Sequence, residues 1–245
     1  MNQCLIGLQN EEDIVNYLDG KRLVQLNEKW KKHIMKMFPF VNDTDVIYSR
    51  KFPDRKAKPD IIVKVRHTCV YVSIKSGKNP SIHQEGFYTF SKFLSKLNVD
   101  EKTLRTIEFY HFGETKKLNN NGVPFTREEL QSQFGSYILK ANEKLDNKRV
   151  IEAVVNRTVI RGVDKHRTGA DFLYYGSVDK GFLLSKEEIY SAVFSYAEHK
   201  NRPIHFGALN YQPSGRKRTT LDYRFVRIKW PLLCVMFYEK DKEQI

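Results

Sequence analysis

The sequence predicts a mixed α/β fold, because its apolar residues follow two different periods along a chain that is long enough to bury a core. In some segments apolar residues recur every three or four positions, as on one face of a helix, and in others they alternate, as on one face of a strand. The chain has 245 residues, of which 40% are hydrophobic and 13% aromatic. We therefore expect a folded protein, and no apolar run is long enough to predict a membrane span.

The first half of the chain reads as a helix, three strands, a helix and a strand. The first helix is expected at about residues 21–38, where five apolar residues recur at helical spacing and a proline follows. The second is expected at about 81–97, because Pro80 precedes a capping box of Ser81 and Gln84. The strands are expected at about 45–52, 59–66, 69–76 and 105–112.

The second half alternates between the two periods again. Helices are expected at about 126–145, 148–159 and 185–199, and the first of them opens with a capping box of Thr126 and Glu129. Strands are expected at about 171–175, 181–184, 204–211, 219–230 and 232–238. A polar loop at 118–124 divides the chain into an N-terminal core, residues 1–117, and an α+β elaboration, residues 118–245, which we expect to pack as one globular unit.

The charge of the chain predicts a polyanionic partner. Forty-two basic residues against twenty-nine acidic ones give a net charge of +13. Residues 51–80 contain eight basic and two acidic residues, and residues 201–230 contain seven and one, so each segment carries +6. Such concentrations are typical of proteins that bind nucleic acid.

The cysteines and the N-terminal residues indicate a cytoplasmic setting. Cys4, Cys69 and Cys234 are odd in number and far apart, which argues against a disulfide framework and against a zinc site with closely spaced ligands. The first eight residues have no basic segment, and Glu11, Glu12 and Asp13 follow soon after, so we expect no secretion signal.

One predicted hairpin gathers three reactive side chains. If the alternating apolar residues of strands 59–66 and 69–76 are buried on one face, Ile61 pairs with Ile74 across a two-residue turn at His67 and Thr68. This register places Asp60 opposite Lys75, with Ser73 beside the lysine on the same face.

An acid, a lysine and a hydroxyl at one place favour phosphodiester hydrolysis. Carboxylates hold Mg²⁺, which activates a water and stabilises the developing charge, and a lysine orients that water. One aspartate supplies too few ligands, so a second acid is required. Glu85 is the candidate, because it is expected in the first turn of the helix at 81–97. We therefore predict Asp60 and Glu85 as metal ligands, with Ser73 and Lys75 completing the catalytic set, and Mn²⁺ as a substitute for Mg²⁺.

The same residues resemble a known motif. Pro59-Asp60, twelve further residues and then Ser73-Ile-Lys75, within the order α-β-β-β-α-β, resemble the PD-(D/E)xK nuclease superfamily, whose restriction-endonuclease-like fold has a mixed sheet. The resemblance covers roughly residues 20–113. In the common form an Asp or Glu stands at position 73. Some restriction endonucleases of the superfamily carry Ser or Cys there and take the carboxylate from the following helix, which matches Glu85.

The resemblance implies a Mg²⁺-dependent endonuclease acting on double-stranded DNA, of restriction or phage-defence type, that works as a homodimer. Residues 118–245 would then serve DNA recognition or dimerisation. Gln84 and Tyr88 also resemble the Gln-x-x-x-Tyr motif of recombination and repair nucleases, so a structure-specific repair enzyme stays open. A third alternative is a nucleic-acid-binding protein that has the fold but does not cut.

The sequence leaves the roles of several further residues open. Gln84 is either the capping partner of Ser81 or a DNA contact. The helix before the hairpin often supplies a metal-binding glutamate in this superfamily, and both Glu11 and Glu28 are open for that role. Phosphate contacts are expected from four basic side chains, Lys78, Arg216, Lys217 and Arg218.

Overall fold

The structure is a computed structural model that describes residues 3–78, 80–112, 126–164, 166–195, 204–213 and 224–243. The chain forms two compact units, each built from segments that are far apart in the sequence. Unit 1 consists of Met1–Pro80 and Asn156–Tyr190, and unit 2 of Ser81–Val155 and Ser191–Ile245. The predicted boundary between residues 117 and 118 lies outside the described residues, and the helices on both sides of it belong to unit 2.

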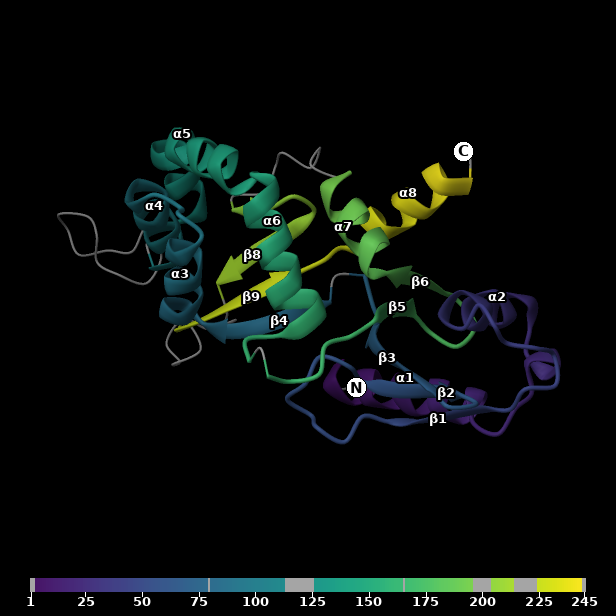
Figure 1. Cartoon of the computed structure of the whole chain (residues 1–245). Coiled ribbons are helices and arrows are strands. Elements are labelled where there is room, and N and C mark those ends of the chain that lie inside the picture. Colours follow the sequence, from purple (N-terminus) through teal and green to yellow (C-terminus); the bar gives the residue numbers. More distant parts are fainter. Residues whose placement is uncertain are drawn as a thin grey trace. The chain divides into compact units, whose positions relative to one another are not determined.

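Unit 1 is built on a mixed five-stranded sheet with the strand order β1-β2-β3-β5-β6 (Figure 1). Strands β3 and β5 run parallel, and every other neighbouring pair is antiparallel. The strands are β1 Ile47–Lys51, β2 Ile61–Val65, β3 Thr68–Lys75, β5 Phe172–Gly176 and β6 Gly181–Ser185. The mixed α/β fold is thereby confirmed. However, the strand that follows β3 in this sheet is β5, about one hundred residues later in the chain, and not the segment 105–112.

Two helices, α1 Gln3–Leu18 and α2 Glu28–Met37, supply the helical part of the unit 1 core. Asn27 caps α2, because its side chain accepts a hydrogen bond of 2.9 Å from the backbone N–H of Trp30. The Trp30 ring stacks on Tyr174 of β5 with ring centroids 4.8 Å apart. The predicted helix at 21–38 is therefore shorter, since residues 23–25 form a separate 3₁₀ turn.

The β2–β3 hairpin forms where it was predicted, but in a different register. Val65 pairs with Thr68 and Ile61 with Val72, so the turn is Arg66-His67 and the predicted pairing of Ile61 with Ile74 is wrong. Arg66 adopts the left-handed conformation that such a tight turn requires, with φ of 53°. The shift is two residues. Because side chains alternate with a period of two, each side chain keeps its predicted face.

Unit 2 contains an antiparallel four-stranded sheet with the order β4-β9-β8-β7. Its strands are β4 Ser81–Gly86, β7 His205–Phe206, β8 Leu209–Pro213 and β9 Phe225–Lys229. Its helices are α3 Phe87–Lys96, α4 Glu101–Phe112, α5 Arg127–Leu145, α6 Lys148–Val155 and α8 Leu232–Glu243. A π-helical segment, Asn156–Arg161, follows α6, and α7 Lys186–Phe194 carries the chain from unit 1 into unit 2.

Four predicted elements of unit 2 are wrong. The segment 204–211 is not one strand, because β7 and β8 form an antiparallel hairpin there. The segment Ser81–Gly86 is strand β4, because it pairs with β9, and the helix begins only at Phe87. Residues 105–112 are helical, since Thr103, Ile107 and Tyr110 bury one face at helical spacing. The apolar run after Pro231 is helix α8 and not a strand; such short apolar runs fit either element.

Other predictions for the second half are confirmed. The capping box opens α5, with Thr126 accepting from the Glu129 N–H at 3.1 Å and donating its own N–H to the Glu129 carboxylate at 2.7 Å. The predicted strands at 171–175 and 181–184 match β5 and β6 to within a residue. Among the described residues, no helix has the length and apolar composition that a membrane span needs.

Candidate functional site

The candidate site lies in unit 1, at the residue that leads into β2. Asp60 is fixed by backbone hydrogen bonds on both sides, because its N–H donates to Val72 O at 2.9 Å and its C=O accepts from Phe52 N at 2.9 Å. The preceding Pro59 is buried. The backbone of Asp60 is thus held between the chain entering from β1 and strand β3.

The carboxylate of Asp60 accepts three hydrogen bonds on one oxygen, Oδ2. The donors are the backbone N–H of Ile74 at 2.6 Å, the Ser73 hydroxyl at 3.0 Å and the Lys75 ammonium at 3.0 Å. Lys75 Nζ also donates to Ile74 O at 2.7 Å. The structure therefore brings together Asp60, Ser73 and Lys75, as the sequence predicted. The observed register places Asp60 opposite Ser73, and Lys75 is the next residue on that face, within diagonal reach.

The three side chains are largely shielded from solvent, but those of Asp60 and Lys75 remain accessible. The side chains of Asp60 and Lys75 are 23% and 18% exposed, and Ser73 is fully buried. Partial burial strengthens these charge-assisted hydrogen bonds relative to a surface pair. Among the described residues, no hydrogen-bond donor reaches the second oxygen of Asp60, Oδ1. That oxygen is therefore available to a ligand.

A second carboxylate, Glu11 of α1, faces the same charges. Glu11 lies on the side of α1 that carries the fully buried Ile14 and Leu18, and it is itself partly buried. Burial raises the pKa of Glu11, the negative charge of Asp60 raises it further, and the positive charges of Lys75 and Lys51 lower it. Glu11, Asp60 and Lys75 thus form one electrostatic cluster, which we call the Asp60 site.

Comparison with known proteins gives one informative likeness. Neither a family model nor a curated protein matches the sequence. Among solved structures, the restriction endonuclease MspI in complex with its cognate DNA superposes with a TM-score of 0.56 at 13% identity, over 94% of this chain and 93% of that chain. The chain has a restriction-endonuclease-like fold. This confirms the predicted fold class, whereas the Ser-x-Lys variant of the motif stays a prediction.

Of the two glutamates left open for this restriction-endonuclease-like fold, only Glu11 belongs to the Asp60 site. Glu28 is exposed at the start of α2 and pairs with Lys31, whose ammonium lies 2.7 Å from the Glu28 carboxylate. The hydrogen bond and charge of Lys31 lower the pKa of Glu28. Asp60 has no resolved influence on it. The sequence signal for Glu11 was its place on the buried face of a helix, beside Ile14 and Leu18.

Glu85, the predicted second ligand, belongs to unit 2, whereas the Asp60 site belongs to unit 1. It is part of strand β4 in unit 2 and not of a helix, which corrects the prediction of its local structure. Its side chain is 5% exposed, and its Oε1 lies 2.9 Å from His83 Nε2. This carboxylate therefore has a buried partner within its own strand. Its role as a metal ligand stays a prediction.

Of the residues predicted to contact DNA, the structure describes Gln84 and Lys78. Gln84 does not cap a helix, since it sits in β4, where its Oε1 accepts a 2.9 Å hydrogen bond from Arg227 Nε. Lys78 is exposed just after β3. Arg216, Lys217 and Arg218 lie outside the described residues. For all of them, contact with DNA stays a prediction.

The donor set of the Asp60 site fits a magnesium ion with two carboxylates. The described residues contain no group of three or more His, Cys, Asp and Glu side chains that could hold a metal. However, Mg²⁺ usually keeps several waters and binds through one or two carboxylates together with substrate phosphates. Asp60 Oδ1 is available and Glu11 carries a destabilised negative charge, so both would gain from a bound cation.

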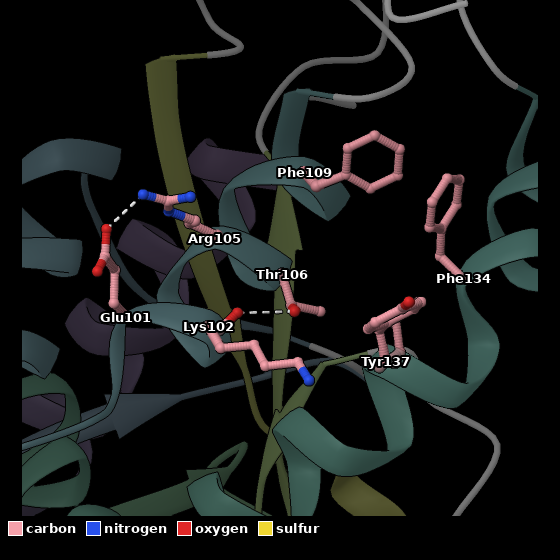
Figure 2. A pocket seen from close by; sticks show the side chains of 8 residues that line it. Glu101, Lys102, Arg105, Thr106, Phe109, Phe134 and Tyr137 are labelled. Carbon is pink, nitrogen blue, oxygen red and sulfur yellow. Dashed lines mark hydrogen bonds and ion pairs between the residues drawn. The ribbon is translucent and has the colours of Figure 1, made fainter.

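Unit 2 contains a separate groove between α4 and α5, with a volume of about 450 Å³ (Figure 2). Phe109 and Phe134 line it with ring centroids 4.2 Å apart, and Tyr137 extends the aromatic wall. Among the described residues that line it, Glu101 is the single acid, and it is engaged by Arg105 at 2.5 Å. The described lining therefore offers no free carboxylate for metal-assisted hydrolysis, and the Asp60 site is the better candidate for chemistry.

Proposed function

We propose that this protein is a Mg²⁺-dependent DNA endonuclease whose active site is the Asp60 site. The observation that carries the proposal is the set of three hydrogen bonds on Asp60 Oδ2, from Ser73, Ile74 and Lys75. A second carboxylate, that of Glu11, interacts with the same charges. This arrangement combines metal-binding oxygens with a positioned cation. It stands on strands β2 and β3 of a restriction-endonuclease-like sheet.

Asp60 and Glu11 would hold the metal. A bound Mg²⁺ ion supplies an activated water and neutralises charge on the phosphoryl and leaving oxygens. Ser73 and the Ile74 N–H fix Asp60 through Oδ2, which would leave Oδ1 free to bind the metal. We assign Ser73 a positioning role, because its hydroxyl contacts Asp60 and is fully buried.

Lys75 would act on the phosphate. Two of the three ammonium protons are used by Asp60 and Ile74 O, and among the described residues the third has no partner. The two hydrogen bonds hold the amine in place before substrate binds. The remaining proton is available to orient the attacking water or to stabilise the negative charge that develops on the phosphoryl oxygens.

Double-stranded DNA is the proposed substrate. Support comes from the net charge of +13, from the +6 carried by residues 51–80 around the site, and from a structural neighbour that was solved with its cognate DNA. We further propose a restriction or phage-defence role in the cytoplasm, with Mn²⁺ as a substitute metal. Residues 118–245 would serve DNA recognition or dimerisation, and a homodimer would cut both strands with two sites.

A second candidate is a DNA-binding protein that does not cut. It is favoured by Ser73, which stands where the common motif carries an acid, and by the lack of a three-ligand cluster among the described residues. A repair or recombination nuclease is the third, on the resemblance of Gln84 and Tyr88 alone.

Incubation of the full chain with a panel of DNAs separates these functions. Supercoiled plasmid, linear phage DNA and a four-way junction are each treated with Mg²⁺, Mn²⁺ or EDTA. Discrete bands that require the metal support a site-specific endonuclease. Cleavage of the junction alone supports a structure-specific nuclease, and a mobility shift without any cleavage supports the non-cutting binder.

A further inference from the structure

The connection between β1 and β2 is closed at its base by the Asp60 site itself. The hydrogen bond from Phe52 N to Asp60 O joins the two ends of this connection, which we call the 53–59 loop (dark blue in Figure 1). The ends of the loop are therefore as fixed as the sheet to which they belong. The base of the loop is thus anchored to the backbone of Asp60.

The loop is also ordered by its own contacts. Asp54 Oδ1 accepts from Lys56 N at 2.9 Å, and Asp54 O accepts from Ala57 N at 3.0 Å, which makes a tight local turn. Arg167 clamps the same carboxylate, with Nη1 at 2.8 and 2.9 Å from its two oxygens. Arg167 Nε in turn donates to Asp164 at 3.2 Å.

The charged side chains of the loop divide into two kinds. Asp54 is engaged by Arg167, and Lys58 Nζ donates to the backbone C=O of Thr158. By contrast, Arg55 and Lys56 are exposed, and neither of their side chains has a hydrogen-bond or ion-pair partner among the described residues. The loop therefore presents two unpaired cations from a backbone that is clamped at its base and at its turn.

We propose that Arg55 and Lys56 bind the phosphate backbone of the DNA strand that enters the Asp60 site. The inference rests on the proposed function and names a contact surface for its substrate. Lys56 lies four residues before Asp60, which limits the Cα–Cα separation to about 14 Å, a span of a few phosphates along one strand. Because the loop is already ordered, little conformational entropy is lost when the phosphates bind. Such contacts position the strand without reading its sequence.

The test is the salt dependence of binding to a duplex of about 30 base pairs, long enough to span the protein. The full chain carries Asp60→Asn, so that no cleavage interferes, and is compared with the same chain carrying Arg55→Ala and Lys56→Ala. Each phosphate contact contributes a slope of about −0.9 to log K against log salt. The double change should therefore flatten the slope by about 1.8 and weaken binding in 0.1 M salt by about sixtyfold.

A matched control removes the same charge from another part of unit 1. Lys31→Ala with Lys32→Ala takes two exposed or partly exposed lysines from α2. The control should leave most of the slope unchanged. Equal losses in both double variants would mean that only net charge matters, and an unchanged slope in the loop variant would mean that the loop does not touch phosphate; either result overturns the proposal. The pair Arg55→Gln and Lys56→Gln repeats the test with longer side chains if the alanine variant loses its thermal transition.

A substitution of Arg167, which holds Asp54, gives an independent test. Arg167→Met releases Asp54 but keeps both loop cations, so affinity should fall while the salt slope stays the same. A slope that flattens as much as in the loop variant would show that Arg167 itself contacts phosphate and would contradict its positioning role. Failure of the nuclease proposal is distinguishable from failure of the loop proposal. A wild-type chain that never cuts DNA can still show the loop-dependent salt slope, and an active nuclease can still lack that slope.

Discussion

Glu11 of α1 and Asp60 at the start of β2 share one electrostatic environment. Burial raises the pKa of Glu11, and the charge of Asp60 raises it further, against the opposing charges of Lys75 and Lys51. Two carboxylates that repel each other beside a lysine lose that repulsion when a divalent cation binds between their oxygens. This relationship supports the proposal that Glu11 holds the metal together with Asp60, a role that the sequence had left open for Glu11 and Glu28.

Glu11→Gln should remove metal-dependent cleavage and stabilise the folded chain at the same time. The amide keeps the shape but not the charge, so a metal ligand and the repulsion with Asp60 are lost together. We expect the cleavage rate to fall at least about a hundredfold, as when one charge-stabilising group is removed from an active site. The thermal midpoint without metal should rise at pH 7, by a few degrees at most.

The pH dependence of that stabilisation has a defined sign. The pKa of Glu11 is higher in the folded chain than its ordinary value of 4.5. The favourable contribution of Glu11 to the free energy of unfolding is therefore complete below pH 4.5. It is lost as the pH rises through the pKa of Glu11 in the folded chain. The difference in thermal midpoint between Glu11→Gln and wild type should grow from pH 4 to pH 7. A variant that is less stable than wild type at pH 7 would contradict the placement of Glu11.

Lys75→Gln should abolish cleavage but leave DNA binding intact. The variant loses the positioned positive charge, whereas affinity depends on many phosphate contacts. Lys75→Arg should not restore the rate, because a guanidinium cannot place a single compact charge between Asp60 and Ile74 O. Single-turnover cleavage and mobility shifts measure the two effects. Cleavage by Lys75→Gln at the wild-type rate would show that this lysine has no catalytic role.

Two substitutions at Glu85 distinguish a metal ligand from a structural carboxylate. The sequence predicts that Glu85→Ala inactivates the enzyme. The structure adds that the alanine also removes a buried partner of His83, which should lower the free energy of unfolding by about 1–3 kcal/mol. Glu85→Gln keeps an acceptor for His83 and should restore most of the stability. If Glu85→Gln is stable and fully active, the predicted metal role of Glu85 is excluded.

His33 should make unit 1 sensitive to acid. Burial lowers the pKa of His33 to about 4, and the charges of Lys29 and Lys36 act in the same direction. Its ring packs edge-on against Trp30 and Tyr174. Because the folded pKa lies below the unfolded value of 6.5, stability is present above pH 6.5 and is lost as the pH falls toward 4, by at most about 3 kcal/mol.

His33→Gln isolates this contribution, since glutamine does not titrate. Denaturant unfolding of the wild type and of the variant should show that wild type loses more stability between pH 6.5 and 4. Parallel pH profiles would mean that the imidazole is already accessible to solvent in the folded chain.

The local alternation of the hairpin was enough to predict that Asp60, Ser73 and Lys75 converge. The predicted register was wrong by two residues. The three side chains still meet, because a shift of two residues leaves every side chain on the same face of its strand. The capping box of α5 was likewise readable, since all of its contacts lie within four residues.

The elements that the sequence misplaced depend on partners far away in the chain. Strand β4 forms because it pairs with β9, about 140 residues later, and this pairing overrides the helix-like capping pattern at Ser81. Strand β5 joins the core sheet by pairing in parallel with β3, which lies about 100 residues earlier in the sequence. The place of Glu11 at the site also depends on how α1 packs on the sheet, which no local pattern specifies.

The most direct test of the account is the rate of DNA cleavage by wild type and by Asp60→Asn, measured with equal amounts of bound DNA. Asparagine can keep the acceptor for Ser73 and Ile74 but has no charge to hold Mg²⁺. We predict that wild type cuts with Mg²⁺ and not with EDTA, and that Asp60→Asn binds DNA as tightly but cuts at least about a hundredfold more slowly. Cleavage by Asp60→Asn at the wild-type rate, or wild-type cleavage that persists in EDTA, would contradict the account.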